Sequence, residues 1–525
     1  MRSNSSRSRQ SFIAGTLVLA AAGVVNRLLG FVPRIALPRM IGADGVGLYQ
    51  MGYPLLIVLL TVITGGIPLS VAKLVAEADS RNDERSIRKT LSAALAATFG
   101  AGLLLAGGFL AVSDLLVGTL FTDERVSAAF RCMAPILPIV AVSAVLRGYF
   151  QGKQNMIPPA SSQIVETVVR IVAVLALSAW LMRYGVEYAA AGAMLGVAAG
   201  ELAGMLMLVG AWRRSTSPLR DGTSVAPAGK SESDATVRSV LGKLLKIAAP
   251  VTGSRLVGSA SYFLESVLIV QSLAAAGVAA SVATAQYGML QGMVIPVLLL
   301  PTALTYSLSV SLVPALSEAA ARNDRDAVRR RLSQSIRLSL VAGAPFVTAM
   351  FVLSEPLCRL LYRNGETGRM LGMMAPFALM LYVQGPLQAA LQALDRPGAA
   401  LRNTVVGAVV KLVLIVVLAS RPEWGIYGAV VAINVNMVLV TILHAASVVR
   451  LLGIRVGLVG DLAKTAACMT FMAAAVVLTA RLTAFAEPSV RFAAACSAGF
   501  AVYTFSAAWL GLIDPRGMLR VILRR

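Results

Sequence analysis

Long apolar stretches alternate with short polar segments along the whole chain. A helix of about 20 apolar residues crosses the hydrocarbon core of a bilayer, and these stretches reach that length. Only helices and closed barrels satisfy their backbone inside a membrane, and these stretches lack the alternation of barrel strands. The pattern therefore predicts an all-α integral membrane protein. We expect about 14 transmembrane helices, at approximately 12–38, 48–71, 90–113, 127–150, 157–181, 188–211, 242–273, 284–313, 333–354, 371–394, 398–419, 425–449, 459–480 and 490–512.

One polar segment, 213–238, is longer than the others and rich in Ser, Gly, Pro and charge, which is typical of a flexible linker. It falls between the sixth and the seventh predicted helix. We therefore expect an N-terminal lobe of six helices at 1–212, a cytoplasmic linker at 213–238, and a C-terminal lobe of six helices at 239–450. Two appended helices and a cytoplasmic tail follow at 451–525.

An internal repeat supports two pseudo-symmetric lobes. Residues 77–92 read EADSRNDERSIRKTLS and residues 318–333 read EAAARNDRDAVRRRLS, with eight of sixteen positions identical. Each copy follows the second helix of its half, and six helices separate the copies, so both have the same orientation. Transporters with such a parallel repeat carry the substrate between the two halves. Convergence of two cytoplasmic polar helices is the alternative explanation.

Charge fixes the expected orientation. The chain is 57% hydrophobic and only 14% charged, with a net charge of +22 and a mean hydropathy of +0.76. With the N-terminus in the cytoplasm, 32 Lys and Arg fall in inner segments and 10 in outer ones. This is the positive-inside pattern of a cytoplasmic-membrane protein, and it explains the basic charge without nucleic acid. We expect both termini in the cytoplasm.

Residues for catalysis and metal binding are sparse. His444 is the only histidine, and the four cysteines are far apart, which argues against a metal site or a disulfide framework. The sequence has no Walker-type phosphate loop and no nucleophile elbow. We therefore expect a transporter without catalytic motif or cofactor, driven by the membrane potential, H⁺ or Na⁺.

Ionisable residues inside the predicted helices mark candidate sites, because they are costly in a membrane. Arg27 and Arg34 are two turns apart on one helix face, about 10 Å along the axis. Two guanidinium groups on one wall can grip a diphosphate through bidentate hydrogen bonds. The alternative is that each side chain extends to the nearer membrane surface.

Other helices carry further charges. Glu166 and Arg170 are four residues apart, so a self-neutralising pair is the simplest interpretation; Glu201 follows in the next helix. Arg255 and Glu265, near three turns apart, also share a face, with Arg255 a further phosphate ligand and Glu265 a proton- or cation-responsive carboxylate. A structural ion pair is equally compatible with that spacing. These residues and Lys411 complete the set of candidate coupling or cavity charges.

Three stretches carry a family resemblance: NRLLGFVPRIALPRMIGADGVGLYQMGYPL at 26–55, GIPLSVAKLVAE at 66–77 and YGMLQGMVIPVLLLPTALTYSLSVSLVPALSEA at 287–319. The chain resembles the polysaccharide-export and lipid flippases of the multidrug/oligosaccharidyl-lipid/polysaccharide (MOP) exporter superfamily, in particular the stage V sporulation protein B and lipid II flippase branches. Arg27 corresponds to the Arg of a Ser-Arg-x-x-Gly motif, with Asn26 in place of serine. Arg34 corresponds to a second arginine, displaced by Pro33, and Ile35 stands where lipid II flippases often have Asp, a departure that fits the sporulation branch better.

The resemblance implies two lobes around a central cavity whose arginines bind the diphosphate, and a lipid-tail groove on the last two helices. We expect a flippase for an undecaprenyl-diphosphate-linked glycan of peptidoglycan or spore-cortex synthesis, active as a monomer among membrane lipids and other cell-wall synthesis proteins. Alternatives are an exporter of other lipid-linked polysaccharide units and a cation-coupled multidrug antiporter, which would need a net acidic cavity. A membrane glycosyltransferase would need a carboxylate on a large outer loop, and the outer loops are short.

Overall fold

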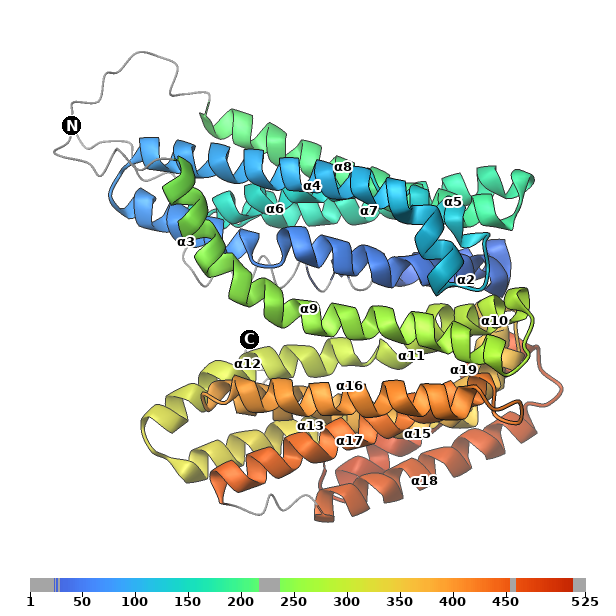
Figure 1. Ribbon diagram of the computed structural model, residues 1–525. Helices are drawn as coiled ribbons and strands as arrows, with labels where there is room; N and C mark the ends of the chain where they lie inside the picture. Colours follow the sequence, from blue (N-terminus) through green and yellow to red (C-terminus); the bar gives the residue numbers. More distant parts are fainter. Residues whose placement is uncertain (1–22, 24, 27–28, 217–236, 454–458, 513–525) are drawn as a thin grey trace. The chain divides into compact units, whose positions relative to one another are not determined.

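The computed structural model describes residues 23, 25–26, 29–216, 237–453 and 459–512, and all regular structure in this part of the chain is helical (Figure 1). Thirteen helical segments within it are long and apolar enough to span a membrane. The predicted first helix, 12–38, lies mostly outside the described residues. The predicted multi-pass all-α membrane fold is confirmed.

The described helices form two compact units, Met1–Ala274 with Ala279–Gly288, and Ala275–Val278 with Met289–Arg525. The first unit contains α2 (Phe31–Thr64), α3 (Ile67–Ser80), α4 (Glu84–Leu120), α5 (Val126–Arg131), α6 (Ile136–Gly152), α7 (Ile157–Leu181), η1 (Met182–Tyr184), α8 (Val186–Thr216), nearly all of α9 (Val237–Ala275) and α10 (Ala280–Tyr287). The second contains α11 (Ile295–Leu299), α12 (Thr302–Ala321), α13 (Arg325–Val352), α14 (Ser354–Tyr362), α15 (Glu366–Ala393), α16 (Pro397–Ala419), α17 (Ile426–Leu452), α18 (Val459–Leu482) and α19 (Pro488–Trp509).

Helix α9 packs within the first unit, although it follows the predicted linker. Its Val240 and Leu244 are buried in one apolar cluster with residues of α3, α4 and α6. A Cβ atom on Gly66 would lie 2.4 Å from the carbonyl oxygen of Ala248, so the glycine allows α9 to approach the chain between α2 and α3. Most of the predicted linker lies outside the described residues, and the predicted lobe boundaries stay a prediction.

The sequence repeat has a structural counterpart in the two units. Asn82 and Asn323 both adopt the left-handed conformation, with φ of 53° and 55°. The aspartate after each asparagine caps the next helix: Asp83 accepts a hydrogen bond from the backbone N–H of Ser86, and Asp324 does so from that of Ala327. Such caps satisfy N–H groups that a helix start leaves without partners. The Arg-Asn-Asp repeat is therefore a repeated helix–turn–helix joint.

Glycines and prolines interrupt several of the predicted spans. Gly42 has φ of 71° and turns the chain sharply inside α2, where two helices meet. Gly65 and Gly66 interrupt the predicted 48–71 span, because they lie between the end of α2 and the start of α3. The predicted 284–313 span is wrong as one continuous helix, because it consists of α10, a seven-residue π-helix at Gly288–Val294, α11 and α12.

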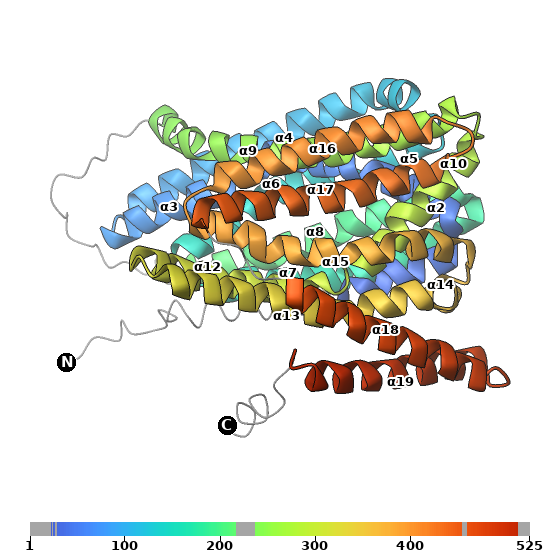
Figure 2. The same ribbon diagram turned by 90° about the horizontal axis from the view of Figure 1, so that it is seen from below.

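Apolar side chains cover the outside of the helices. Leu104 on α4 is 79% exposed, and Phe505 on α19 is 75% exposed. Water would disfavour such surfaces, whereas lipid tails solvate them. The two last helices, α18 and α19, form a hairpin beside α13 (Figure 2), and the Tyr503 hydroxyl on α19 donates to the Val341 carbonyl on α13 at 2.8 Å.

Candidate functional site

A buried group of charges lies in the first unit, where α6, α7 and α8 pack together. Glu166 on α7 is only 8% exposed. The Nη2 atom of Arg147 on α6 lies 2.6 Å from its Oε2 atom, and the Nη1 atom of Arg170 lies 3.1 Å from its Oε1 atom. The expected Glu166–Arg170 pair is therefore present, and a second arginine shares the same carboxylate.

Glu201 on α8 joins this group. Its carboxyl group interacts electrostatically with Glu166, Arg147 and Arg170, and its Oε2 atom is buried without a hydrogen-bond partner among the described residues. Two arginines and two glutamates therefore meet inside one helix bundle, and we call them the four-residue charge cluster: Arg147, Glu166, Arg170 and Glu201.

A glycine stripe on α8 lets the helices approach closely enough to form this cluster. It consists of Gly192, Gly196, Gly200 and Gly204, spaced four residues apart. A Cβ on Gly196 would lie 2.4 Å from the backbone nitrogen of Val174, and one on Gly200 would lie 2.5 Å from the Cβ of Arg170. Small residues at this spacing allow membrane helices to pack backbone against backbone. The stripe thus places Glu201 beside Glu166.

Tyrosines connect the cluster to α2 and α9. The rings of Tyr49 and Tyr53 on α2 lie 5.9 Å apart. Both Arg170 and Arg34 interact electrostatically with the Tyr49 hydroxyl. On α9, Tyr262 interacts in the same way with Arg34 and Tyr53. Arg34 is itself exposed and has no ion pair with a described carboxylate, so its guanidinium is available to an anion.

The remaining predicted site residues are distributed more widely. Arg255 is exposed and Glu265 is buried on the same helix, α9. The separation of ten residues corresponds to a rotation about 80° short of three full helical turns, so the two side chains share a face only approximately. It also corresponds to about 15 Å along the helix axis, which is too far for a direct ion pair. Lys411 lies on α16 in the second unit and is half-buried. Arg27 lies outside the described residues.

A second ionic network joins α2, α10 and the segment between α4 and α5. Arg125 donates two hydrogen bonds to Asp44, at 2.7 and 2.8 Å, and also binds Asp123 at 2.8 Å. Thr284 on α10 donates to Asp123 at 2.8 Å. Burial pushes the pKa of Asp123 upward, but the hydrogen bonds from Arg125 and Thr284 outweigh it and hold that pKa below its usual value. The network ties α10 to α2.

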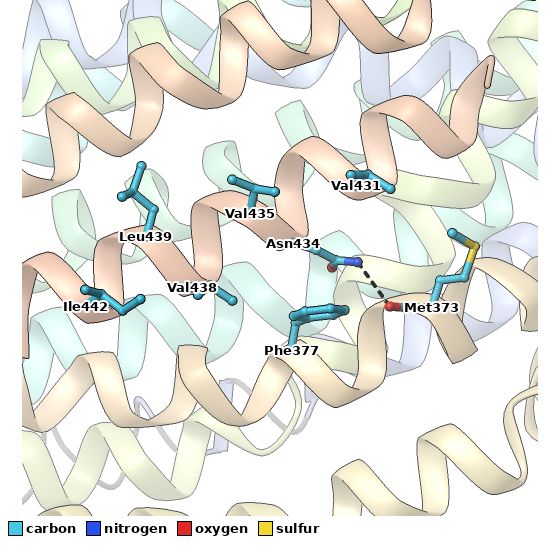
Figure 3. Close-up of a pocket in the computed structure, with 8 residues that line it drawn as sticks. All are labelled: Met373, Phe377, Val431, Asn434, Val435, Val438, Leu439 and Ile442. Atoms are coloured by element: carbon cyan, nitrogen blue, oxygen red, sulfur yellow. Dashed lines mark hydrogen bonds between the residues drawn. The ribbon is translucent and has the colours of Figure 1, made fainter.

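An apolar pocket of about 550 Å³ lies in the second unit, between α15 and α17 (Figure 3). Asn434 is the one polar residue among those that line it. The Asn434 side-chain amide donates to the Met373 carbonyl at 3.0 Å, and Gln384 makes a second bond between the same helices, to the Met437 carbonyl at 3.1 Å. Both amides therefore join helices, as intramembrane amides commonly do.

The chain is similar in sequence to known protein families and to a known protein. Residues 12–320 match the model of the polysaccharide biosynthesis protein family, and residues 256–417 match the MatE model. Stage V sporulation protein B of Bacillus subtilis (strain 168) is 44% identical over 85% of each chain. The chain belongs to the polysaccharide biosynthesis protein family.

More distant relatives and solved structures are similar over most of the chain. The lipid II flippase MurJ of B. subtilis (strain 168) is 25% identical over 77% of this chain and 76% of its own. A structure of lipid II flippase MurJ in an inward closed conformation has a TM-score of 0.67 at 15% identity, covering 94% of this chain and 98% of that one. An inward-facing multidrug resistance MATE family transporter has a TM-score of 0.61 at 14% identity, covering 81% and 95%. These structures share the fold.

One residue of the four-residue charge cluster in this polysaccharide biosynthesis family member was not predicted from the sequence. Arg147 is not among the predicted site residues, but it lies on α6 and binds Glu166. Its place inside the apolar stretch 127–150 was the signal that could have identified it. The glycine stripe on α8 was equally visible in the sequence, and it indicates a helix face in close contact.

Proposed function

We propose that this protein is a flippase that carries an undecaprenyl-diphosphate-linked glycan precursor across the cytoplasmic membrane, for peptidoglycan or spore-cortex synthesis. Its family membership and its similarity to stage V sporulation protein B and lipid II flippase MurJ support lipid-linked transport. The observation that carries the substrate class is a set of accessible arginines in the first unit: Arg34 and Arg255 are exposed, and Arg170 is 31% exposed.

Accessible guanidinium groups suit a diphosphate. Each guanidinium group is planar and offers pairs of N–H hydrogen-bond donors. Charge-assisted hydrogen bonds to phosphate are stronger than hydrogen bonds between neutral groups. In this proposal Arg27, Arg34 and Arg255 bind the diphosphate, while the lipid tail stays in the bilayer. Glu265 and Lys411 contribute coupling or cavity charge, and the membrane potential, H⁺ or Na⁺ supplies the energy. The protein acts as a monomer without cofactor or covalent chemistry, with both termini in the cytoplasm and other cell-wall synthesis proteins as partners.

A multidrug antiporter fits the charges less well. Organic cations require carboxylates that are free to bind them, whereas Glu166 is already bound by two arginines. An exporter of other lipid-linked polysaccharide units would use the same arginines, so only the glycan distinguishes it from the leading proposal. Competition between lipid-linked glycans in the assay below separates these two substrates.

The test is flipping in vesicles that contain the purified full-length protein. A fluorescent undecaprenyl-diphosphate-linked disaccharide is incorporated, and its exposure to a membrane-impermeant quencher is followed with time. We expect Arg34→Ala to slow flipping about tenfold to a hundredfold, because a hydrogen bond to a charged group contributes about 1.5–3 kcal/mol. Arg34→Lys should retain part of the flipping rate, since lysine keeps the positive charge but lacks the paired N–H donors of the guanidinium group.

Arg85→Ala is the matched control, because Arg85 is exposed at the start of α4, away from the tyrosines that adjoin Arg34. It should flip at the wild-type rate. Wild-type vesicles that do not flip the disaccharide, but do export a cationic drug, would refute the proposed function in favour of the antiporter. Full activity of Arg34→Ala would remove Arg34 from the binding site.

A further inference from the structure

An arginine and two exposed aromatic side chains form a cluster where α7 ends. The Cζ atom of Arg183 lies 4.8 Å from the ring centroid of Trp180 and 4.8 Å from that of Tyr184. The centroids of these two rings are 6.5 Å apart, and the ring planes make an angle of 88°. Trp180 is 55% exposed, Tyr184 is 59% exposed, and Arg183 is exposed as well. These three residues, which we call the Arg183 cluster, therefore present an oriented cation on the protein surface.

The Arg183 cluster lies at the end of a membrane-spanning segment. The segment Ile157–Tyr184, which is long and apolar enough to cross a membrane, ends in the cluster, and the next such segment begins at Val186. Trp and Tyr side chains favour the boundary between hydrocarbon and water, where the phospholipid headgroups lie. The phosphate of a phospholipid is therefore the anion that is most abundant at this depth.

Arg183 has hydrogen-bond donors to offer to such an anion. A cation–π contact uses the charge of a guanidinium group and none of its N–H groups. Arg183 forms no hydrogen bond or ion pair with another described residue. The carboxylate of the neighbouring Glu187 instead lies over Gly185, 3.1 Å from the position that a Cβ atom would take there. The paired N–H donors of Arg183 can therefore bind a phosphate in a bidentate way.

An apolar track leads away from the Arg183 cluster along α7. It consists of Val168, Val172 and Ala176, which are spaced four residues apart. Trp180 continues the same spacing, so its ring and the track share one broad side of the helix. Val168 is 46% exposed, Val172 is 62% exposed, and Ala176 is exposed. These short side chains leave room for an acyl chain against α7, while the headgroup of the same lipid reaches Arg183.

We propose that Trp180, Arg183 and Tyr184 form a binding site for an anionic membrane phospholipid, with its phosphate at Arg183 and an acyl chain along the apolar track. This site is separate from the proposed transport of a lipid-linked glycan and does not depend on it. Charge favours an anionic lipid such as phosphatidylglycerol over phosphatidylcholine. Aromatic rings can attract the quaternary ammonium of phosphatidylcholine, but here Arg183 already occupies both rings and repels a second cation.

The test is tryptophan quenching in vesicles that contain the full-length protein with Trp180 as its single tryptophan. Trp212, Trp424 and Trp509 are replaced by phenylalanine, and lipids with brominated acyl chains quench the fluorescence of a tryptophan that they contact. Brominated phosphatidylglycerol should quench Trp180 with about fivefold higher relative affinity than brominated phosphatidylcholine, a ratio equivalent to about 1 kcal/mol. Arg183→Gln should remove this preference. Arg183→Lys should keep part of it, because lysine keeps the charge without the paired donors.

Two further variants separate a bound lipid from general attraction to a basic protein. Arg421→Gln removes the same charge from an exposed position just after α16 and should leave the preference at Trp180 unchanged. Tyr184→Leu keeps the charge of Arg183 and an apolar side chain but loses one of the two rings, so it should lower the preference.

Equal quenching of Trp180 by the two brominated lipids in the wild type would overturn the proposal. A preference that persists in Arg183→Gln, or that falls as much in Arg421→Gln, would overturn it as well. If undecaprenyl diphosphate displaced brominated phosphatidylglycerol at a lower mole fraction than unlabelled phosphatidylglycerol does, the site would belong to the transported lipid and the phospholipid assignment would be wrong. The flipping assay tests the proposed function independently of all these outcomes.

Discussion

The glycine stripe on α8 gives a quantitative prediction for Gly200→Ala. The added Cβ would lie 2.5 Å from the Cβ of Arg170 and 2.8 Å from the carbonyl oxygen of Glu166. Neither atom is the end of a flexible chain, so α7 and α8 must move apart. Overpacking of this kind costs about 1–3 kcal/mol. Alanine also gains about 1 kcal/mol in helix propensity over glycine, which acts in the opposite direction.

A second glycine of α8 isolates the two effects. A Cβ on Gly210 meets nothing within 4 Å, so Gly210→Ala gains the propensity without the collision. The difference in stability between the two variants is then the overpacking cost alone, about 1–3 kcal/mol in favour of Gly210→Ala. Heat denaturation in detergent, followed by the loss of monodisperse protein in size-exclusion chromatography, measures this difference. Equal denaturation temperatures for the two variants would refute the close approach of α7 and α8.

Two further predictions concern α9 and the Arg125 network. With single cysteines introduced at position 255 or 265 of a cysteine-free protein, a water-soluble thiol reagent should label position 255 and not position 265, because Arg255 is exposed and Glu265 is 6% exposed. Lipid-linked substrate should protect position 255 from labelling. Equal labelling of the two positions would contradict the burial of Glu265. Arg125→Gln should destabilise the protein by about 1–3 kcal/mol, because Asp123 stays buried without its cation. Since the folded pKa of Asp123 lies below its usual value, its contribution to the free energy of unfolding is present at neutral pH and is lost as pH falls through the folded pKa. Denaturation temperatures of the wild type should therefore fall on acidification more than those of Arg125→Gln, and parallel falls would contradict the network's role.

The membrane fold could be predicted from the sequence because its signals are local. Each span carries its own apolar length, and the Arg-Asn-Asp repeat carries its own turn and cap. The Glu166–Arg170 pair was equally accessible, since a separation of four residues brings side chains together on any helix. The helix break at Gly65 and Gly66 was harder to predict from the sequence, because membrane helices often contain glycine without ending there.

Contacts between distant helices were beyond local reasoning. Arg125 and Asp44 are 81 residues apart, and no periodicity relates them. Glu201 was identified as an intramembrane charge, but its electrostatic interaction with Glu166 depends on the approach of α8 to α7. The separation of Arg255 from Glu265 shows a second limit, because a spacing near three turns is treated as one face although the residual rotation is about 80°.

The π-helix at Gly288–Val294 also indicates where the length of this chain can vary. A π-helical turn is equivalent to an α-helical turn with one residue inserted, and single turns of this kind recur at functional sites. Because the wider turn accommodates the extra residue, loss of one residue from this segment would restore α-helical geometry without rotating the flanking helices relative to each other. Homologues can therefore differ by one residue in this segment and still keep the orientation of both flanking helices. An alignment of the family should allow a gap of one residue there.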